Sequence, residues 1–334
     1  MGVARSKHIS VVLADGRVLV AGGSTSGGGV TNAAELYDPT TNSWTSLAGG
    51  MVEARVGHTA TLLKDGRVLL AGGQGPSGTV SATAEIFDPA AGSVALAGVL
   101  SSPRKSHAAA LLSDGRVIIV GGSDGSNILA TSDIYDPATN SISAGPSLAV
   151  PRAGHSATAL LDGNVLVAGG NSGSTDLASA EVYVVASGQF SAMPATLAAP
   201  RTEHVAFLLP NNNSVLIVGG SSSSATVASA ELYIPWAAAF KPTGALSAAR
   251  AGAAGSPLKQ DGLLLLAGGA NDSGKLASAE LYGFATIKTD KADYAPGDIV
   301  TITGSGWQPG ETVDRKSTRL NSSHIQKSRM PSSA

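Results

Sequence analysis

The sequence predicts an all-β protein built from six stacked, four-stranded antiparallel sheets, and three features support this. The 334-residue chain contains six copies of one pattern, each copy holds four short β-prone runs, and the copies recur at steps of 48 to 50 residues. Such a period with four strands per unit is typical of a β-propeller, in which small sheets stack radially. A Gly-Gly pair marks each copy: Gly22-Gly23, Gly72-Gly73, Gly121-Gly122, Gly169-Gly170, Gly219-Gly220 and Gly268-Gly269.

The first two strands of each copy are predicted from an Asp-Gly pair between apolar runs. In the second copy, residues 58–63 precede Asp65-Gly66 and residues 67–71 follow it. Because Asp-Gly tolerates the positive φ angles of a type I′ turn, we expect a hairpin. The pair recurs as Asp15-Gly16, Asp114-Gly115, Asp162-Gly163 and Asp261-Gly262, and the fifth copy has Asn211-Asn212-Asn213 instead, which can adopt the same angles.

The third strand follows the Ser/Gly-rich loop behind Gly-Gly and ends at an aromatic residue. In the second copy Phe87 precedes Asp88-Pro89, where proline presets φ and lacks the N–H that a central strand needs. An apolar residue seven positions after the aromatic predicts the fourth strand: Trp44, Val94, Ile142, Phe190 and Phe240. A unit this small cannot bury both faces of its own sheet, so neighbouring sheets are expected to stack face to face.

These phrases resemble kelch repeats, and the tightest match is to their bacterial form, through RVGHTATLL and DGRVLVAGG. The resemblance covers residues 5–282 and implies a propeller of six or seven blades without implying a single activity. We therefore expect a six-bladed kelch-type β-propeller over residues 1–285. Its repeats begin near residues 5, 55, 104, 152, 201 and 250.

Both ends of the repeat region depart from the pattern. Gly283-Phe284 replace Asp-Pro in the sixth copy, and Thr289 stands at its fourth-strand position. A ring must be closed by a complete last blade or by a strand from the other terminus. Two questions therefore stay open: whether the sixth blade is complete, and whether a seventh blade lies upstream. Met1 lies four residues before Arg5, and Met51 lies four residues before Arg55 in the second copy. Met1 therefore matches a position inside the repeat, which predicts that it is internal to a longer protein.

Two further segments follow the repeats. Residues 286–313 contain Pro-Gly turns around the alternating strand 299–303 and resemble the first strands of an immunoglobulin-like module of bacterial surface proteins, here truncated. A complete module of this kind needs roughly 100 residues. Residues 314–334 resemble a translated sequencing adapter, through DRKSTRLNSSH and SRMPSSA, and are expected to be a non-native, disordered tail.

Composition excludes several function classes. The chain has no cysteine, which rules out disulfides, thiolate metal sites and the cysteine-linked site of kelch-type copper-radical oxidases. Without the tail, 17 basic and 23 acidic residues leave a formal charge of −6, so no nucleic-acid partner is expected. No run of 18 apolar residues predicts a membrane span.

An arginine begins each of the six repeats, and in the first five repeats a histidine follows it three residues later. A metal site is one interpretation, but equivalent positions of a propeller are spread around an axis, whereas ligands must converge on one ion at about 2.0–2.2 Å. We favour structural histidines that donate to a neighbouring backbone carbonyl. No metal and no other cofactor is expected. The histidines are His8, His58, His107, His155 and His204, and the sixth copy has Ala253 instead.

Six arginines and six acids form the candidate ring of charged residues. We expect each arginine to pair with the carboxylate of its own repeat, because a partly buried guanidinium needs a bidentate acceptor. The alternative is a ring of unpaired arginines at the channel mouth that attracts an anion. The residues are Arg5, Arg55, Arg104, Arg152, Arg201 and Arg250, with Glu35, Glu85, Asp133, Glu181, Glu231 and Glu280.

The predicted function is a non-enzymatic binding scaffold. The variable loops after Gly-Gly, and those joining blades, would recognise a protein or an extracellular polymer, with the protein monomeric and at the cell surface or secreted. An enzyme acting on a carbohydrate-type substrate, as hydrolase, epimerase or lyase, is the alternative, and Asp124, Asp176 and Asp272 are the isolated loop acids it could use. A spacer without a ligand is a third interpretation. The loops are 24–33, 74–83, 123–131, 171–179, 221–229 and 270–278.

Overall fold

A computed structural model describes residues 1–209, 213–258, 263–283, 286–289 and 302–305. The chain divides into two compact units. The first comprises residues 1–254 and 268–278, and the second comprises residues 255–267 and 279–334.

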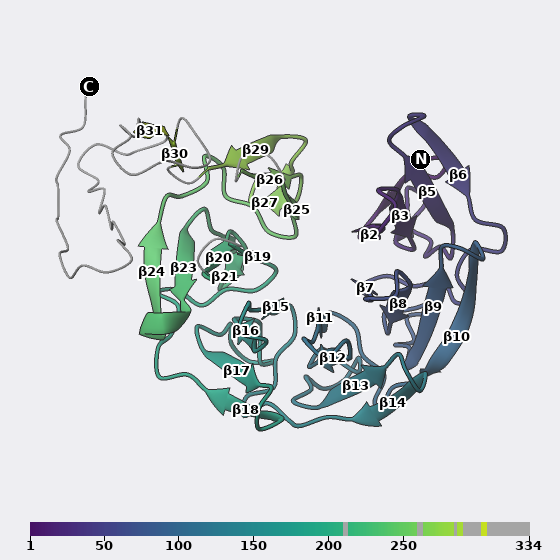
Figure 1. The fold of residues 1–334 in the computed structure, drawn as a ribbon, viewed down its shortest axis with the longest axis horizontal. Coiled ribbons are helices and arrows are strands. Elements are labelled where there is room, and N and C mark those ends of the chain that lie inside the picture. Colours follow the sequence, from purple (N-terminus) through teal and green to yellow (C-terminus); the bar gives the residue numbers. More distant parts are fainter. Residues whose placement is uncertain (210–212, 259–262, 284–285, 290–301, 306–334) are drawn as a thin grey trace, which may run out of the picture. The chain divides into compact units, whose positions relative to one another are not determined.

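The first unit contains five four-stranded antiparallel sheets, the blades, and each takes its strands from one repeat (Figure 1). The first strands of successive blades contact one another around the centre, so each blade runs outward in chain order. The strands are β2 (Ile9–Val12), β3 (Val18–Ala21), β5 (Ala34–Asp38) and β6 (Ser43–Ser46); β7 (Thr59–Leu62), β8 (Val68–Ala71), β9 (Thr83–Asp88) and β10 (Ser93–Val99); β11 (Ala108–Leu111), β12 (Val117–Val120), β13 (Ser132–Asp136) and β14 (Ser141–Ala144); β15 (Ser156–Ala159), β16 (Val165–Ala168), β17 (Ala180–Val184) and β18 (Gln189–Ala192); β19 (Val205–Leu208), β20 (Val215–Val218), β23 (Ala230–Ile234) and β24 (Ala239–Thr243).

Short antiparallel pairs extend three of the loops. They are β1 (Arg5–Ser6) with β4 (Ser24–Thr25), β21 (Ser221–Ser222) with β22 (Ala225–Thr226), and β27 (Ala270–Asn271) with β28 (Gly274–Lys275). The 3-10 turn η1 (Pro235–Ala237), which begins at a proline, is the one helical segment among the residues described. The protein is therefore all-β.

The four described Asp-Gly segments, at residues 15–16, 65–66, 114–115 and 162–163, form the predicted hairpins, but with a different turn. Asp261-Gly262, and Asn211-Asn212 of the fifth copy, lie outside the described residues. Gly16 has a φ of 90°, whereas Asp15 has a negative φ, so the type I′ prediction was wrong. The Gly16 N–H donates to the Leu13 carbonyl (3.0 Å) and the Leu13 N–H donates to the Arg17 carbonyl (2.8 Å). This is a three-residue loop ending in a left-handed glycine, which accommodates a G1 bulge. The aspartate remains useful because its carboxylate accepts the Arg17 N–H at 3.0 Å.

The predicted fourth strands are confirmed by the pairing of each repeat aromatic with the apolar residue seven positions later. Tyr37 lies opposite Trp44, and their ring centroids are 5.1 Å apart. Cross-strand contacts of this kind stabilise a sheet beyond their backbone hydrogen bonds. The other pairs are Phe87 with Val94, Tyr135 with Ile142, Tyr183 with Phe190, and Tyr233 with Phe240.

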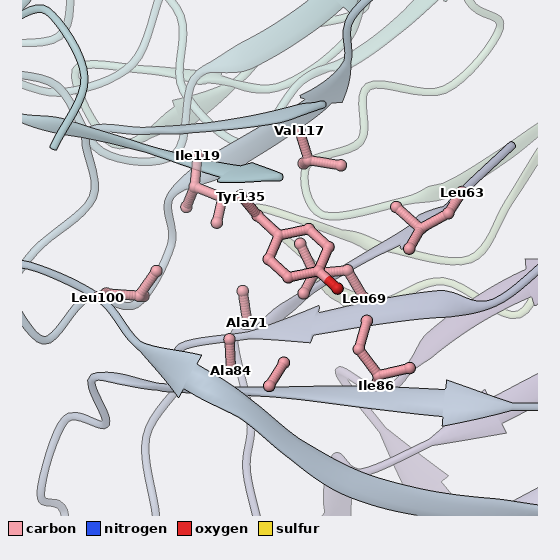
Figure 2. Close-up of a cluster of buried hydrophobic side chains, with 10 residues drawn as sticks. Leu63, Leu69, Ala71, Ala84, Ile86, Leu100, Val117, Ile119 and Tyr135 are labelled. Atoms are coloured by element: carbon pink, nitrogen blue, oxygen red, sulfur yellow. The ribbon is translucent and has the colours of Figure 1, made fainter. Parts of the chain in front are cut away.

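The core lies between the blades. Each of its clusters draws side chains from two successive blades, which confirms the predicted face-to-face stacking. In Figure 2, Leu69 and Ile86 from the second blade pack against Val117, Ile119 and Tyr135 from the third, and Tyr135 is fully buried. Two layers only about 10 Å apart leave room for few large side chains, which agrees with the many alanines and glycines of the sequence.

The second unit contains the described part of the sixth blade. Strands β25 (Ala254–Pro257), β26 (Leu264–Ala267) and β29 (Ala279–Tyr282) form a three-stranded sheet in the order of the first three strands of a blade. Thr289, the predicted fourth-strand position, lies in β30 (Thr286–Thr289), which pairs with β31 (Ile302–Ser305) and not with β29. The remaining residues of segment 286–313, and the tail 314–334, lie outside the described residues, so both assignments stay predictions.

These sheets confirm the fold class, a propeller of six antiparallel blades. Five blades have four strands, and the described sheet of the sixth has three. No helix in the described part of the chain is long and apolar enough to cross a membrane.

Candidate functional site

The repeated polar residues gather at one end of each blade. This end, called the clamp end below, comprises the Gly-Gly pair, the loop from the second to the third strand, and the segment that enters from the preceding blade. The Asp-Gly and Asp-Pro turns form the opposite, hairpin end. Alternating strand direction places the two sets of connections at opposite ends, since all blades are antiparallel.

Arg104 shows the geometry of the clamp. Its Nη2 donates to Asp133 Oδ2 at 2.6 Å, while its Nη1 donates to the carbonyls of Gly121 at 2.7 Å and Thr131 at 3.0 Å. Both charged side chains are 0% exposed. One guanidinium therefore joins the entering segment to the end of β12 and the start of β13. Burial lowers the pKa of Arg104 below its ordinary value, and the adjacent Asp133 carboxylate opposes that shift.

The same ion pair occurs in each of the five blades of the first unit. The distances are 3.0 Å for Arg5–Glu35, 2.5 Å for Arg55–Glu85, 2.6 Å for Arg104–Asp133, 2.9 Å for Arg152–Glu181 and 2.8 Å for Arg201–Glu231. In the sixth repeat, Arg250 Nη1 donates to the carbonyls of Gly268 (2.9 Å) and Ser278 (3.1 Å). Glu280 lies on β29.

The pairing differs from the expected bidentate form. Only Nη2 reaches the carboxylate, and the Nε atoms of Arg104 and Arg152 have no hydrogen-bond partner among the described residues. The second carboxylate contact goes to the backbone instead: Glu181 accepts the N–H groups of Ala149 (2.8 Å) and Val150 (3.1 Å). The carboxylate thus fixes the segment that enters the blade. Because the five paired arginines are buried, they do not present a ring of free cations to an anion.

The arginine backbone joins adjacent blades. The Gly122 N–H donates to the Arg152 carbonyl of the next blade at 2.8 Å. A Cβ on Gly121 would lie 2.5 Å from that carbonyl oxygen and 2.8 Å from His155 Cε1, and Gly121 has a φ of 62°. Gly-Gly therefore ends the second strand at a point where neighbouring backbones approach too closely for a side chain.

His58, His107, His155 and His204 are packed against the preceding blade, and their pKa values lie well below 6.5, so they are neutral near pH 7. Burial, aided by the nearby arginine, lowers the pKa of His58, His155 and His204 to about 3. His107 Nε2 lies 2.9 Å from Thr59 Oγ1 of the preceding blade, and His204 Nε2 lies 2.9 Å from Ser156 Oγ. The expected backbone carbonyl is therefore replaced by a hydroxyl in these two blades.

Two other histidines lack such a hydroxyl. Neither ring nitrogen of His58 or His155 has a hydrogen-bond partner in the described structure. Thr59 and Ser156, which supply the hydroxyls, are each the first residue of the innermost strand of their blade. The equivalent residue in the blade before His58 is Ile9, and in the blade before His155 it is Ala108, and neither has a hydroxyl. No group of three or more His, Asp or Glu that could hold a metal ion occurs in the described ranges.

The isolated loop acids form hydrogen bonds between and within loops. Asp124 accepts the N–H of Asn127, in its own loop, at 2.6 Å. Asp176 accepts the Ser223 N–H of the next blade at 2.7 Å, and Asp272 accepts the Thr226 N–H of the preceding blade at 2.9 Å. Asp176 and Asp272 thus support the loop of the fifth blade from both sides.

Sequence reasoning missed one repeated position, two residues after each clamp arginine. All six residues there have a left-handed backbone: Lys7 (φ 54°), Gly57 (67°), Ser106 (53°), Gly154 (65°), Glu203 (54°) and Gly252 (61°). Neighbours are joined by backbone hydrogen bonds of 2.8 to 3.0 Å from Ser106 to Gly57, Gly154 to Ser106, Glu203 to Gly154, and Gly252 to Glu203. The three glycines were the available signal.

Comparison with known proteins agrees with this geometry. The KLHDC2/KLHL20/DRC7 Kelch-repeats domain matches residues 7–220. No curated protein matches the chain. The matched range includes the sheets of four complete blades and three complete clamps, Arg55–Glu85, Arg104–Asp133 and Arg152–Glu181, and it covers more than half of the chain. The chain belongs to the kelch-repeat family.

Proposed function

We propose that this protein is a non-enzymatic binding scaffold that recognises a protein partner through the loops at its clamp end. The observation that carries the proposal is the division of labour between residues at this end. The six repeated arginines, the repeated acids of the first five blades, and His58, His107 and His155 are buried, whereas the loop tips differ in sequence and are exposed. The exposed tips are residues 26–29, 76–79, 125–127, 173–175, 223–225 and 272–275.

The loops start from one rigid frame. Residues directly after Gly-Gly pair with the entering segment in every repeat, for example Gln74 with Val56, Ser123 with Lys105, and Asn171 with Ala153. A rigid frame that carries variable segments reduces the entropy lost on binding. The tips are rich in Ser and Gly, which supply adaptable hydrogen bonds, and contain no aromatic side chain for sugar stacking. This composition favours a protein partner over an extracellular polymer.

The test is a selection of peptides from a phage-displayed random dodecapeptide library on the full chain. Two variants each add a long charged side chain to an exposed tip, Ser126→Lys and Ala225→Lys. Both should keep the wild-type melting temperature, because the clamp is untouched, and at least one should lose binding of the selected peptides. Absence of any selected peptide, or binding unaffected by both variants, contradicts the proposal. A parallel panel of soluble polysaccharides would identify a polymer ligand instead.

We also propose that the intact protein is exported by a bacterium and acts at the cell surface. The support is the resemblance of residues 286–313 to an immunoglobulin-like module of bacterial surface proteins. Fractionation of cells that express the complete gene tests this. Recovery of the protein in the cytosol alone would contradict it.

A further inference from the structure

One cavity in the described part of the chain lies away from the clamp and the variable loops. It has a volume of about 230 Å³ and is found at the hairpin end, between the second and third blades, whose outer strands β10 and β14 are neighbours (Figure 1). Residues of β9 and β10 line one side, and Asn140, from the turn between β13 and β14, lines the other. Arg67 Nη2 crosses the gap to the Pro137 carbonyl at 3.3 Å. A cavity of this size is smaller than the site of a drug-sized ligand, so it suits a small molecule.

Part of the cavity wall is aliphatic. Ile86 on β9 is 7% exposed, and Ala95 lies opposite it on β10. Leu96 belongs to the same wall and is 56% exposed. Water in contact with such side chains is released when an apolar group covers them, which favours a ligand with an aliphatic part.

Three polar side chains of the cavity keep an atom for a ligand. Asp88 Oδ1 accepts two backbone N–H groups of its own turn, at 2.8 and 3.1 Å, and its Oδ2 has no partner among the described residues. Asn140 Oδ1 accepts the Tyr135 hydroxyl at 2.9 Å, so its Nδ2 is left to donate. Ser93, opposite Asp88 on β10, adds a hydroxyl that can donate or accept.

Arg67 brings a positive charge to the same cavity. Its Nε and Nη2 donate to Asp65 Oδ2 at 2.9 and 2.7 Å, and its Nη1 has no partner in the described ranges. The Asp65 hydrogen bond, together with the charges of Asp65 and Asp88, raises the pKa of Arg67 above its ordinary value. A cationic donor and an anionic acceptor therefore lie within electrostatic range of each other in one cavity.

Asn140 and Ala95 distinguish this interface from the other three between blades of the first unit. No other interface has an amide side chain at the first position or a residue as small as alanine at the second. Both residues therefore depart from the repeat, so the fold does not explain their combination, and such departures are where function resides in repeat proteins. The equivalents are Gly92, Gly188 and Ala238 for Asn140, and Thr45, Ser143 and Ser191 for Ala95.

We propose that this cavity binds a free α-amino acid with an aliphatic side chain, such as leucine. The ligand carboxylate accepts from Arg67 Nη1 and Asn140 Nδ2, and the ligand ammonium group donates to Asp88 Oδ2. The ligand side chain covers the aliphatic wall. Opposite charges in one small cavity select a dipolar molecule over a simple anion or cation. The site is separate from the loops at the clamp end and does not depend on the function proposed for them.

Nuclear magnetic resonance titration of the full chain with three related compounds tests the ligand class. L-Leucine should bind about tenfold more tightly than leucinamide, which lacks the carboxylate, and than 4-methylpentanoate, which lacks the ammonium group. Equal binding of leucine and leucinamide would make this a cation site, and equal binding of leucine and 4-methylpentanoate would make it an anion site. Either result overturns the proposal, and so does the absence of saturation at about 20 mM leucine.

Variants locate the bound leucine. Asp88→Asn keeps the Oδ1 that caps the turn and should weaken binding about tenfold by removing the charge. Ala95→Thr introduces the residue that the first blade has at this position, so it should preserve the fold while filling the cavity and abolishing binding. Asp38→Asn, at the equivalent turn of the first blade, is the matched control and should leave the affinity unchanged. Melting temperatures confirm that all three variants fold. Binding that survives both Asp88→Asn and Ala95→Thr, or that Asp38→Asn weakens equally, overturns the site.

Discussion

The third blade holds two arginine–carboxylate pairs at its opposite ends, and they occupy different environments. At the clamp end, Arg104 and Asp133 are 0% exposed and 2.6 Å apart. At the hairpin end, Arg116 and Asp114 are each 40% exposed and 2.7 Å apart. The distances are nearly equal, but only the first pair has lost its water. The comparison teaches that the environment of a repeated ion pair, and not its geometry, decides whether it supports the fold.

Removing one member of each pair gives the largest expected difference. Arg104→Met should reduce the free energy of unfolding by about 3–5 kcal/mol, because it leaves a buried carboxylate with no cation. Arg116→Met should reduce it by less than about 1 kcal/mol, because water replaces the lost partner. Urea denaturation of both variants measures this. Equal losses would show that the clamp pair is no more important than the surface pair.

Glycines at the two ends extend the comparison. Gly72→Ala at the clamp end should destabilise by about 3 kcal/mol or more, since its Cβ would meet the Arg104 carbonyl oxygen and lie 2.7 Å from His107 Cε1. Gly66→Ala at the hairpin end should cost about 1 kcal/mol, because its φ of 88° is strained but no atom lies within 4 Å. Thermal unfolding of the two variants distinguishes crowding from strain alone.

Acid should weaken the clamp end before the hairpin end. The pKa of His155 is about 3 in the folded protein and its ordinary value is 6.5, so between these values the unfolded chain binds more protons and stability falls as pH falls. At pH 5 the loss is about 2 kcal/mol for this histidine, relative to pH 7. At the hairpin end, hydrogen bonds from Arg17 and Arg67 lower the pKa values of Asp15 and Asp65 below their ordinary value, so these pairs keep their charges from pH 7 to pH 5.

The measurement is urea unfolding at pH 7 and pH 5. His155→Gln should show a smaller drop than the wild type, by about that same 2 kcal/mol, because glutamine does not titrate. An equal drop in both proteins would mean that His155 is protonated while folded, and that the packing described for it is wrong.

The smallest effect concerns the two histidines without a hydroxyl partner. Ala108→Ser places a hydroxyl where Ser156 supplies one to His204, and should stabilise the protein by about 1 kcal/mol by satisfying His155 Nε2. Ala109→Ser, one residue along the same strand, is the control and should not stabilise. A neutral or negative result for Ala108→Ser would indicate that the hydroxyl cannot reach the ring.

Sequence reasoning was accurate where the repeat itself carries the signal. Phe87 and Val94 recur at a fixed spacing, and the structure pairs them across β9 and β10. The arginine–carboxylate pairing of the clamp could be predicted for the same reason, because six arginines accompany six acids at repeated positions. The type I′ turn at Gly16 and the bidentate contact of Arg104 were wrong, because both depend on local geometry that spacing does not specify. The hydroxyl partners of His107 and His204 come from another blade, at a separation of 48 residues.

The all-β class and the six repeats follow from the amino-acid pattern alone, because periodic apolar residues and turn residues act locally and recur in each copy. Only the tertiary structure decided which of two similar arginine–acid pairs is buried, which histidines find a hydroxyl, and that Lys7, Ser106 and Glu203 share a left-handed backbone. Those properties depend on the approach of neighbouring blades, and burial and strain are set by what surrounds a residue in space.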